Sequence, residues 1–265
     1  MRRYTLFHPN RWLGWDVIPY FATPIGDWSS DAAARRRPAT ANPPRPEDDV
    51  FGGLGTMRYQ VEVRFDDLDG TTLASPGIDA VDTYGIEASV HRVSLRRDDT
   101  YLGWLTSYFL VPEVFGSAGP GENHQTQRYA GVDCADVLIG ALHAQGHEDV
   151  PYSSVSALDR YTTLVAGPAE LDEDGKAVDA DITGALPGDI IRIDYSGVWA
   201  GSTPRTWDHV AVLSEDRSDP EGPLEGRADG RLDGFDLVVH LGHPRLTVEP
   251  LGRQCPMRID VLRWD

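Results

Sequence analysis

The amino-acid sequence predicts an α+β fold for the second half of the chain, mainly from the order of the expected elements. A helical pattern begins at Cys134, and a second helix is expected over residues 153–165. Helices followed by a set of antiparallel strands are typical of an α+β domain. The strands are expected after Pro187 and Gly188, as short β-runs over residues 190–195, 209–213, 235–241, 246–248 and 258–264.

The chain is expected to contain three regions. Residues 1–56 predict an N-terminal extension or linker, because the segment 32–49 is rich in Ala, Arg and Pro. Residues 57–99 predict a small β-rich accessory region, and residues 100–265 predict the main domain. With 265 residues, 40% of them hydrophobic, the chain is long enough to bury a core of its own.

Hydrophobic periodicity supports the elements expected between residues 57 and 112. The segment 101–111 is apolar and aromatic, and its spacing predicts an amphipathic helix that ends before Pro112. The β-rich region shows the alternation of a half-buried strand. The alternating residues are Tyr59, Val61, Val63 and Phe65.

The net charge of the chain limits the classes of partner that it is expected to bind. The formal net charge is −18, with 42 acidic and 24 basic side chains. This charge argues against nucleic acid or an anionic membrane as a partner. No apolar run is long enough to cross a bilayer. The first residues also lack the apolar segment of a Sec-type signal. Location therefore stays open between a bacterial secreted or envelope protein whose signal was removed and a protein that is cytoplasmic or exported by another route.

The two cysteines, Cys134 and Cys255, are too few for a disulfide scaffold and do not form a zinc-binding C-x-x-C pair. The cysteines therefore give no indication of a zinc site. A disulfide between the two cysteines stays open. In the alternative, one thiol is reactive and Cys255 is a packed or exposed bystander.

Cys134 is expected at the first turn of a helix. Asp133 is a favourable N-cap residue, Asp136 lies where a capping-box partner would, and Gly146 can end the helix. The partial positive charge of a helix N-terminus favours a thiolate, and its N–H groups can hold an oxyanion. The pattern is equally compatible with a buried structural cysteine.

Two histidines on expected strands could serve such a thiol as a base. His209 begins the run 209–213, and His240 ends the run 235–241. A strand holds an imidazole firmly, and a second polar group beside it can set its tautomer. His243 is an alternative to His240, but strand alternation puts the two on opposite faces, which favours His240.

Five segments, in order, resemble the motifs of NlpC/P60 cell-wall peptidases. The resemblance covers roughly residues 100–265. The segments are Pro112-Glu113-Val114-Phe115-Gly116-Ser117, Gly131-Val132-Asp133-Cys134, Leu186-Pro187-Gly188-Asp189-Ile190, Asp208-His209-Val210-Ala211-Val212 and Leu237-Val238-Val239-His240.

The resemblance implies a papain-like α+β fold and hydrolysis of amide bonds in peptidoglycan stem peptides. In this picture Cys134 attacks the carbonyl and His209 takes the thiol proton, while His240 orients His209, and no metal or cofactor is needed. Tyr129 is a candidate for the aromatic residue that the family carries near its domain start. Asp133 and Asp208 are candidates for residues that orient groups or line the cleft.

Two other functions stay open. The same thiol chemistry could serve an acyltransferase or a secreted toxin, with an immunity or structural protein as partner. A papain-like fold without catalysis is the alternative of a different class, because Ala135 and Asp136 stand where the family has Ser and Gly.

Overall fold

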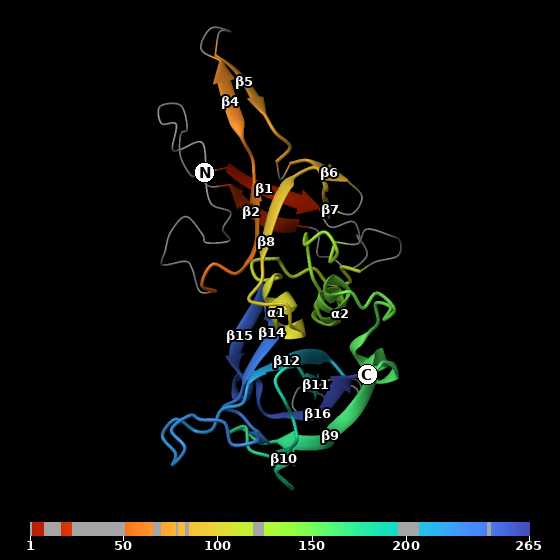
Figure 1. Ribbon diagram of the computed structural model, residues 1–265, viewed down its shortest axis with the longest axis vertical. Coiled ribbons are helices and arrows are strands. Elements are labelled where there is room, and N and C mark those ends of the chain that lie inside the picture. Colours follow the sequence, from red (N-terminus) through yellow and green to blue (C-terminus); the bar gives the residue numbers. More distant parts are fainter. Residues whose placement is uncertain are drawn as a thin grey trace. The chain divides into compact units, whose positions relative to one another are not determined.

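The computed structural model describes residues 2–7, 17–22, 51–65, 70–77, 79–82, 85–118, 125–195, 207–242 and 245–265 (Figure 1). The expected linker over residues 32–49 and the candidate His243 lie outside this part. The chain forms two compact units. Unit 1 comprises Met1–Asp99 and Gly103–Asp133, and unit 2 comprises Thr100–Leu102 and Cys134–Asp265. The expected boundaries at residues 57 and 100 stay a prediction.

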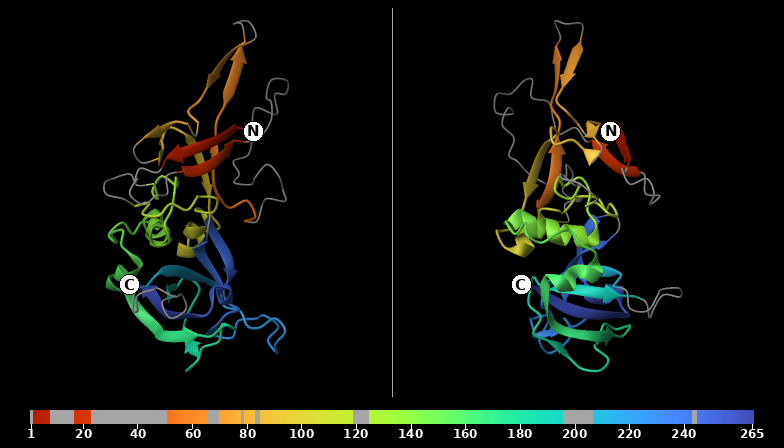
Figure 2. Two further views of the ribbon diagram at one scale, coloured as in Figure 1. Left: turned by 180° about the vertical axis from the view of Figure 1, so that it is seen from behind. Right: turned by 90° about the vertical axis from the view of Figure 1, so that its right-hand side faces the viewer.

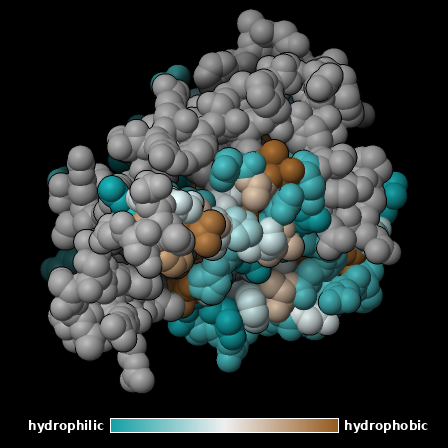
Figure 3. Space-filling model, turned by 90° about the horizontal axis from the view of Figure 1, so that it is seen from above, coloured by the Kyte–Doolittle hydropathy of each residue, from teal (hydrophilic) through white to brown (hydrophobic). Residues whose placement is uncertain are grey.

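Two-stranded antiparallel sheets dominate the described part of unit 1. The strand pairs are β1 (Arg2–Phe7) with β2 (Val17–Ala22), β3 (Gly55–Tyr59) with β8 (His91–Leu95), β4 (Glu62–Phe65) with β5 (Thr71–Ala74) and β6 (Val81–Asp82) with β7 (Gly85–Ile86). The β-structure expected after residue 57 is confirmed. In Figure 3 the coloured part of the surface is mostly hydrophilic, with separate apolar spots.

The alternating run from Tyr59 to Phe65 is two strands rather than one. The chain leaves its pairing with β8 at Gln60 and begins to pair with β5 at Glu62. Ser75 stabilises the point where the chain changes its partner strand. Its hydroxyl accepts a hydrogen bond from the Val61 N–H at 3.0 Å, and its own N–H donates to the Val61 carbonyl at 2.9 Å.

The helix expected over 101–111 is shorter than predicted. It forms as α1 (Tyr101–Thr106) and gives way to turns. The Thr106 and Ser107 hydroxyls donate to carbonyls three residues earlier, at 2.6 Å each, and Leu110 has a φ of 70°. Such side-chain bonds compete with regular helical pairing, and a left-handed residue ends it.

Unit 2 is built on a six-stranded, wholly antiparallel sheet of order β15-β14-β12-β11-β16-β9 (Figures 1 and 2). All five expected β-runs are confirmed as strands of this sheet. The strands are β9 (Thr162–Leu171), β11 (Ile190–Asp194), β12 (His209–Glu215), β14 (Leu237–Gly242), β15 (Arg245–Pro250) and β16 (Met257–Trp264).

The second predicted helix, over residues 153–165, is wrong. A 3₁₀ turn, η4 (Val155–Arg160), occupies its first part, and β9 begins at Thr162. The β-branched residues Thr162, Thr163 and Val165 favour a strand, and pairing with β16 fixes it there. Tertiary pairing therefore overrides the helical spacing.

Both faces of the central strands are buried, and one apolar cluster lies on the face that carries the histidines. Because opposed residues of antiparallel strands share a face, the register fixes which side chains meet. Ile193 of β11 lies opposite the first residue of β12, and Ala211 of β12 lies opposite residue 240 of β14. Ile191, Ile193, Ala211, Leu213 and Val238 belong to one buried cluster.

The helix predicted from Cys134 is confirmed as α2 (Cys134–Gln145). Its residues 135–142 are all buried, which suits a helix enclosed by other elements. Gly146, at a φ of 110°, ends it: its N–H donates to the His143 carbonyl at 2.9 Å, and the His147 N–H donates to the Leu142 carbonyl at 3.1 Å. The helix packs against β12, beside which it lies in Figures 1 and 2.

The fold class predicted from the sequence, α+β, is confirmed, with little helix in the described residues. A short strand pair, β10 (Ile182–Thr183) with β13 (Arg231–Leu232), and the 3₁₀ turn η5 (Leu251–Gln254) complete unit 2. Within the described residues, no helix combines the length and the apolar character needed to cross a bilayer.

Candidate functional site

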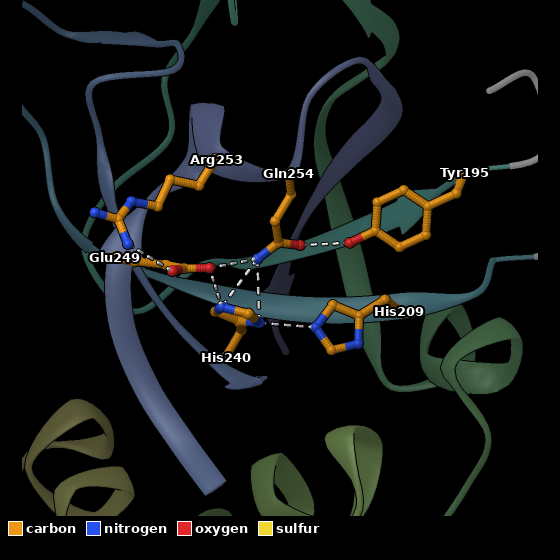
Figure 4. Close-up of polar contacts among 6 residues, drawn as sticks. All are labelled: Tyr195, His209, His240, Glu249, Arg253 and Gln254. Atoms are coloured by element: carbon orange, nitrogen blue, oxygen red, sulfur yellow. Dashed lines mark hydrogen bonds and ion pairs between the residues drawn. The ribbon is translucent and has the colours of Figure 1, made fainter. Parts of the chain in front are cut away.

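Three polar side chains lie in a diagonal row across three neighbouring strands. His240 is opposite Ala211, so His209, two residues before Ala211, lies on the same face. His240 is also opposite Thr247, so Glu249, two residues further along β15, lies on that face too. The row therefore forms a polar end to the apolar face of the sheet (Figure 4).

Short contacts join this row. His209 Nε2 lies 3.1 Å from His240 Nδ1, and His240 Nε2 lies 2.8 Å from Glu249 Oε1. The two imidazole rings are almost perpendicular, at 89°, so each nitrogen contact is made edge-on. His240 is buried, with 5% of its surface exposed, so both of its ring nitrogens are used inside the protein.

Gln254 and Tyr195 enclose the row from the other side. Gln254, the last residue of η5, places its amide nitrogen 3.1 Å and 2.9 Å from the two ring nitrogens of His240. Its amide oxygen accepts a hydrogen bond from the Tyr195 hydroxyl. The Tyr195 ring stacks on His209 with the ring centres 6.4 Å apart, so both histidines are covered (Figure 4).

Burial keeps both imidazoles neutral. It lowers the pKa of His209 from 6.5 to about 3, with the neighbouring His240 as the second cause. Burial also lowers the pKa of His240, against a smaller opposing effect of Glu249. At neutral pH His209 is therefore an uncharged imidazole. A pKa this far below 7 also makes it a weak base, since a general base is most effective when its pKa lies near the working pH.

The low pKa of His209 predicts a loss of stability in acid. Between pH 6.5 and about 3 the unfolded chain binds a proton at this residue that the folded chain does not. This contribution to the free energy of unfolding is complete above pH 6.5 and is lost as the pH falls towards 3. We expect His209→Gln to lose less stability than the wild type between pH 6.5 and 4 in urea unfolding experiments. Parallel losses in both proteins would contradict the assignment.

Cys134 is the first residue of α2, the helix that packs on β12, and is partly exposed. Burial raises the pKa of the Tyr195 hydroxyl, and nearby acidic groups, among them Asp208 and the Cys134 thiol, raise it further. A contact between Cys134 and His209 stays a prediction.

Cys255 has a different environment. It is not in a disulfide, and it packs against the apolar cluster of the sheet. Burial, with a contribution from Asp172, raises the pKa of its thiol to about 11. A thiol that stays protonated is a poor nucleophile, which fits the bystander role expected from the sequence.

The structure places the two acidic candidates as follows. Asp133 directly precedes α2, and its carboxylate accepts the Gly116 N–H at 2.8 Å while its own N–H donates to the Ser117 hydroxyl at 2.9 Å. Asp208 is exposed, and its carboxylate accepts the Tyr195 N–H at 3.0 Å. Asp208 therefore anchors the start of the segment that carries the site tyrosine.

Tyr129 belongs to unit 1 and is buried there. Its ring stacks on Tyr108 at 4.1 Å between centres, and the Arg92 guanidinium lies 4.3 Å above the ring. Its hydroxyl accepts a hydrogen bond from Ser107 at 3.1 Å, and its φ is 56°. These contacts give Tyr129 a packing role within unit 1, and its part in a site stays a prediction.

Sequence reasoning missed Glu249, Gln254 and Tyr195. Each is a common polar residue outside the motifs. Glu249 reaches the site through the β14–β15 hairpin, Gln254 through the turn η5 that follows it, and Tyr195 from the end of β11. A period-two count from His240 through the turn to β15 could have suggested Glu249. No group of His, Cys, Asp and Glu in the described part of the chain is arranged to hold a metal ion.

Comparisons of the chain with protein-family models, with curated proteins and with solved structures found no match.

Proposed function

We propose that this protein is a cysteine hydrolase of amide bonds, with Cys134 as nucleophile, His209 as general base and His240 as the residue that orients His209. One observation carries the proposal. Cys134 begins the helix that packs on β12, and β12 begins with a partly exposed histidine in contact with a second, buried histidine. A nucleophile, a base and an orienting group are the parts that such catalysis needs.

In the proposed reaction, Cys134 Sγ attacks the amide carbonyl carbon while His209 takes the thiol proton. The oxyanion forms at the N-terminus of α2, where the partial positive charge of the helix stabilises it. The C–N bond then breaks, His209 protonates the leaving amine, and a thioester remains. Water attacks the thioester, with His209 again accepting a proton, and the acid leaves as the thiol is restored.

His209 uses Nε2 for its contact with His240, so Nδ1 is the ring nitrogen for the thiol. The resemblance of residues 100–265 to NlpC/P60 peptidases, together with the six-stranded antiparallel sheet and the helix that begins at Cys134, supports a papain-like fold. The resemblance also suggests the substrate, the peptide stems of peptidoglycan.

The test is digestion of purified peptidoglycan by the full chain, measured as the release of new amino groups. We expect the wild type to release them and Cys134→Ala to lose this activity, because the alanine has no nucleophile. Cys255→Ala is the matched control and should keep the activity. Equal activity of Cys134→Ala and the wild type would refute the proposal. Transfer of the acyl group to an added amine, in place of hydrolysis, would indicate an acyltransferase.

A further inference from the structure

Glu249 is the last member of the polar row, and its position has a consequence for His209. We propose that Glu249 is a positioning residue that acts through His240 and fixes the tautomer of His209. The consequence for catalysis rests on the proposed function, whereas the tautomers themselves can be observed without it.

Glu249 is in direct contact with His240. A carboxylate can only accept hydrogen bonds. Since Glu249 Oε1 lies 2.8 Å from His240 Nε2, that nitrogen carries the hydrogen and donates it. The pair is well shielded, because the side chain of His240 is 7% exposed and that of Glu249 is 21% exposed. A hydrogen bond in such surroundings discriminates strongly between tautomers.

The tautomer of His240 then determines the tautomer of His209. A neutral imidazole has one N–H, so Nδ1 of His240 is left as an acceptor. His209 Nε2 lies 3.1 Å from that atom and must be the donor. Its Nδ1 then holds a lone pair, which is the form that can take a proton from a thiol. The opposite tautomer of His240 would turn both contacts round and leave His209 Nδ1 protonated.

Gln254 also contacts His240, but it does not replace Glu249 as the partner of His240 Nε2. Its amide nitrogen lies at nearly equal distances, 3.1 Å and 2.9 Å, from both nitrogens of the His240 ring. A donor in the ring plane would be near only one of them, so the amide rests against the ring face. The same nitrogen lies 3.5 Å from Glu249 Oε1, and Arg253 lies 3.7 Å from the other carboxylate oxygen. Both groups are hydrogen-bond donors, so they leave Glu249 as the acceptor in its contact with His240.

The experiment compares the wild type, Glu249→Met and Glu249→Gln. Long-range ¹H–¹⁵N correlations of the full chain give the tautomers of His240 and His209, and iodoacetamide alkylation at pH 6 gives the reactivity of Cys134. We expect Nε2–H for both histidines in the wild type. Methionine removes the acceptor, so both histidines should lose this single tautomer and alkylation should slow by about tenfold or more. Glutamine keeps an acceptor oxygen and should preserve most of both signals.

Glu221→Met is the control, since Glu221 is an exposed glutamate that should leave both readouts unchanged. An Nδ1–H tautomer of His240 in the wild type would overturn the proposal, whether or not the variants fold. Unchanged tautomers in a folded Glu249→Met would overturn it as well. Tautomers that change as expected while Cys134 reacts no faster than a free thiol would uphold the role of Glu249 and refute the proposed function.

Discussion

Replacing His209 with glutamine is expected to slow both peptidoglycan hydrolysis and the alkylation of Cys134 near neutral pH. Glutamine is close to histidine in size but cannot take a proton, so the thiol loses its base. General-base catalysis by a positioned side chain contributes about 10²- to 10⁴-fold, and we expect hydrolysis to fall by this amount. In the wild type, transfer of the thiol proton to His209 would form a thiolate–imidazolium pair. The population of such a pair does not change with pH while the pair keeps its one proton, so alkylation should fall less steeply than that of an ordinary thiol between pH 5 and 7.

The rate of an ordinary thiol falls about tenfold for each unit of pH below its pKa, since only the thiolate reacts. The His209→Gln variant should show this dependence, whereas the wild type should not. His147→Gln is the matched control, because His147 is exposed just beyond the end of α2. If both variants alkylate at the wild-type rate over the whole pH range, His209 is not the base of Cys134.

The Asp260→Asn variant is expected to lower the free energy of unfolding by about 3 kcal/mol, which makes it the largest stability effect that we predict. Asp260 of β16 lies opposite Arg192 of β11 in the middle of the sheet. The pair is bidentate, with Nε–Oδ1 at 2.9 Å and Nη2–Oδ2 at 2.6 Å, and its side chains are 5% and 7% exposed. Asparagine would leave the guanidinium charge buried without a counter-charge.

The Trp207 ring covers the Arg192 guanidinium, with 4.6 Å between the guanidinium carbon and the ring centre. Arg192 could therefore move towards solvent only if this ring moved away. Urea unfolding measures the effect. The control is Asp181→Asn, which removes the same charge from an exposed pair with Arg231 at 3.0 Å and should cost about 0–1 kcal/mol. The double variant Arg192→Met/Asp260→Leu should recover most of the loss, since apolar replacements avoid the desolvation of the charges. Equal costs for Asp260→Asn and Asp181→Asn would contradict this account.

Local chemistry was enough to predict many elements of unit 2. Asp133 and Gly146 mark the two ends of α2, because caps act over a few residues, and alternating apolar residues mark the strands of the sheet. The sequence also drew attention to Cys134, His209 and His240, since each lies at the end of a predicted element. It failed for β9, where strand pairing with β16 outweighed the helical spacing of residues 153–165.

The sequence by itself determined the start of a helix at Cys134, the approximate positions of five strands, and the thiol and imidazoles that these elements carry. Only the tertiary structure decided which of these groups meet. The contacts of His240 with His209, Glu249 and Gln254 depend on the register of β12, β14 and β15 and on the turn that follows β15. A shift of one residue in any of these pairings would send the side chains to the other face of the sheet. That register is set by the packing of the whole apolar face, which no local pattern contains.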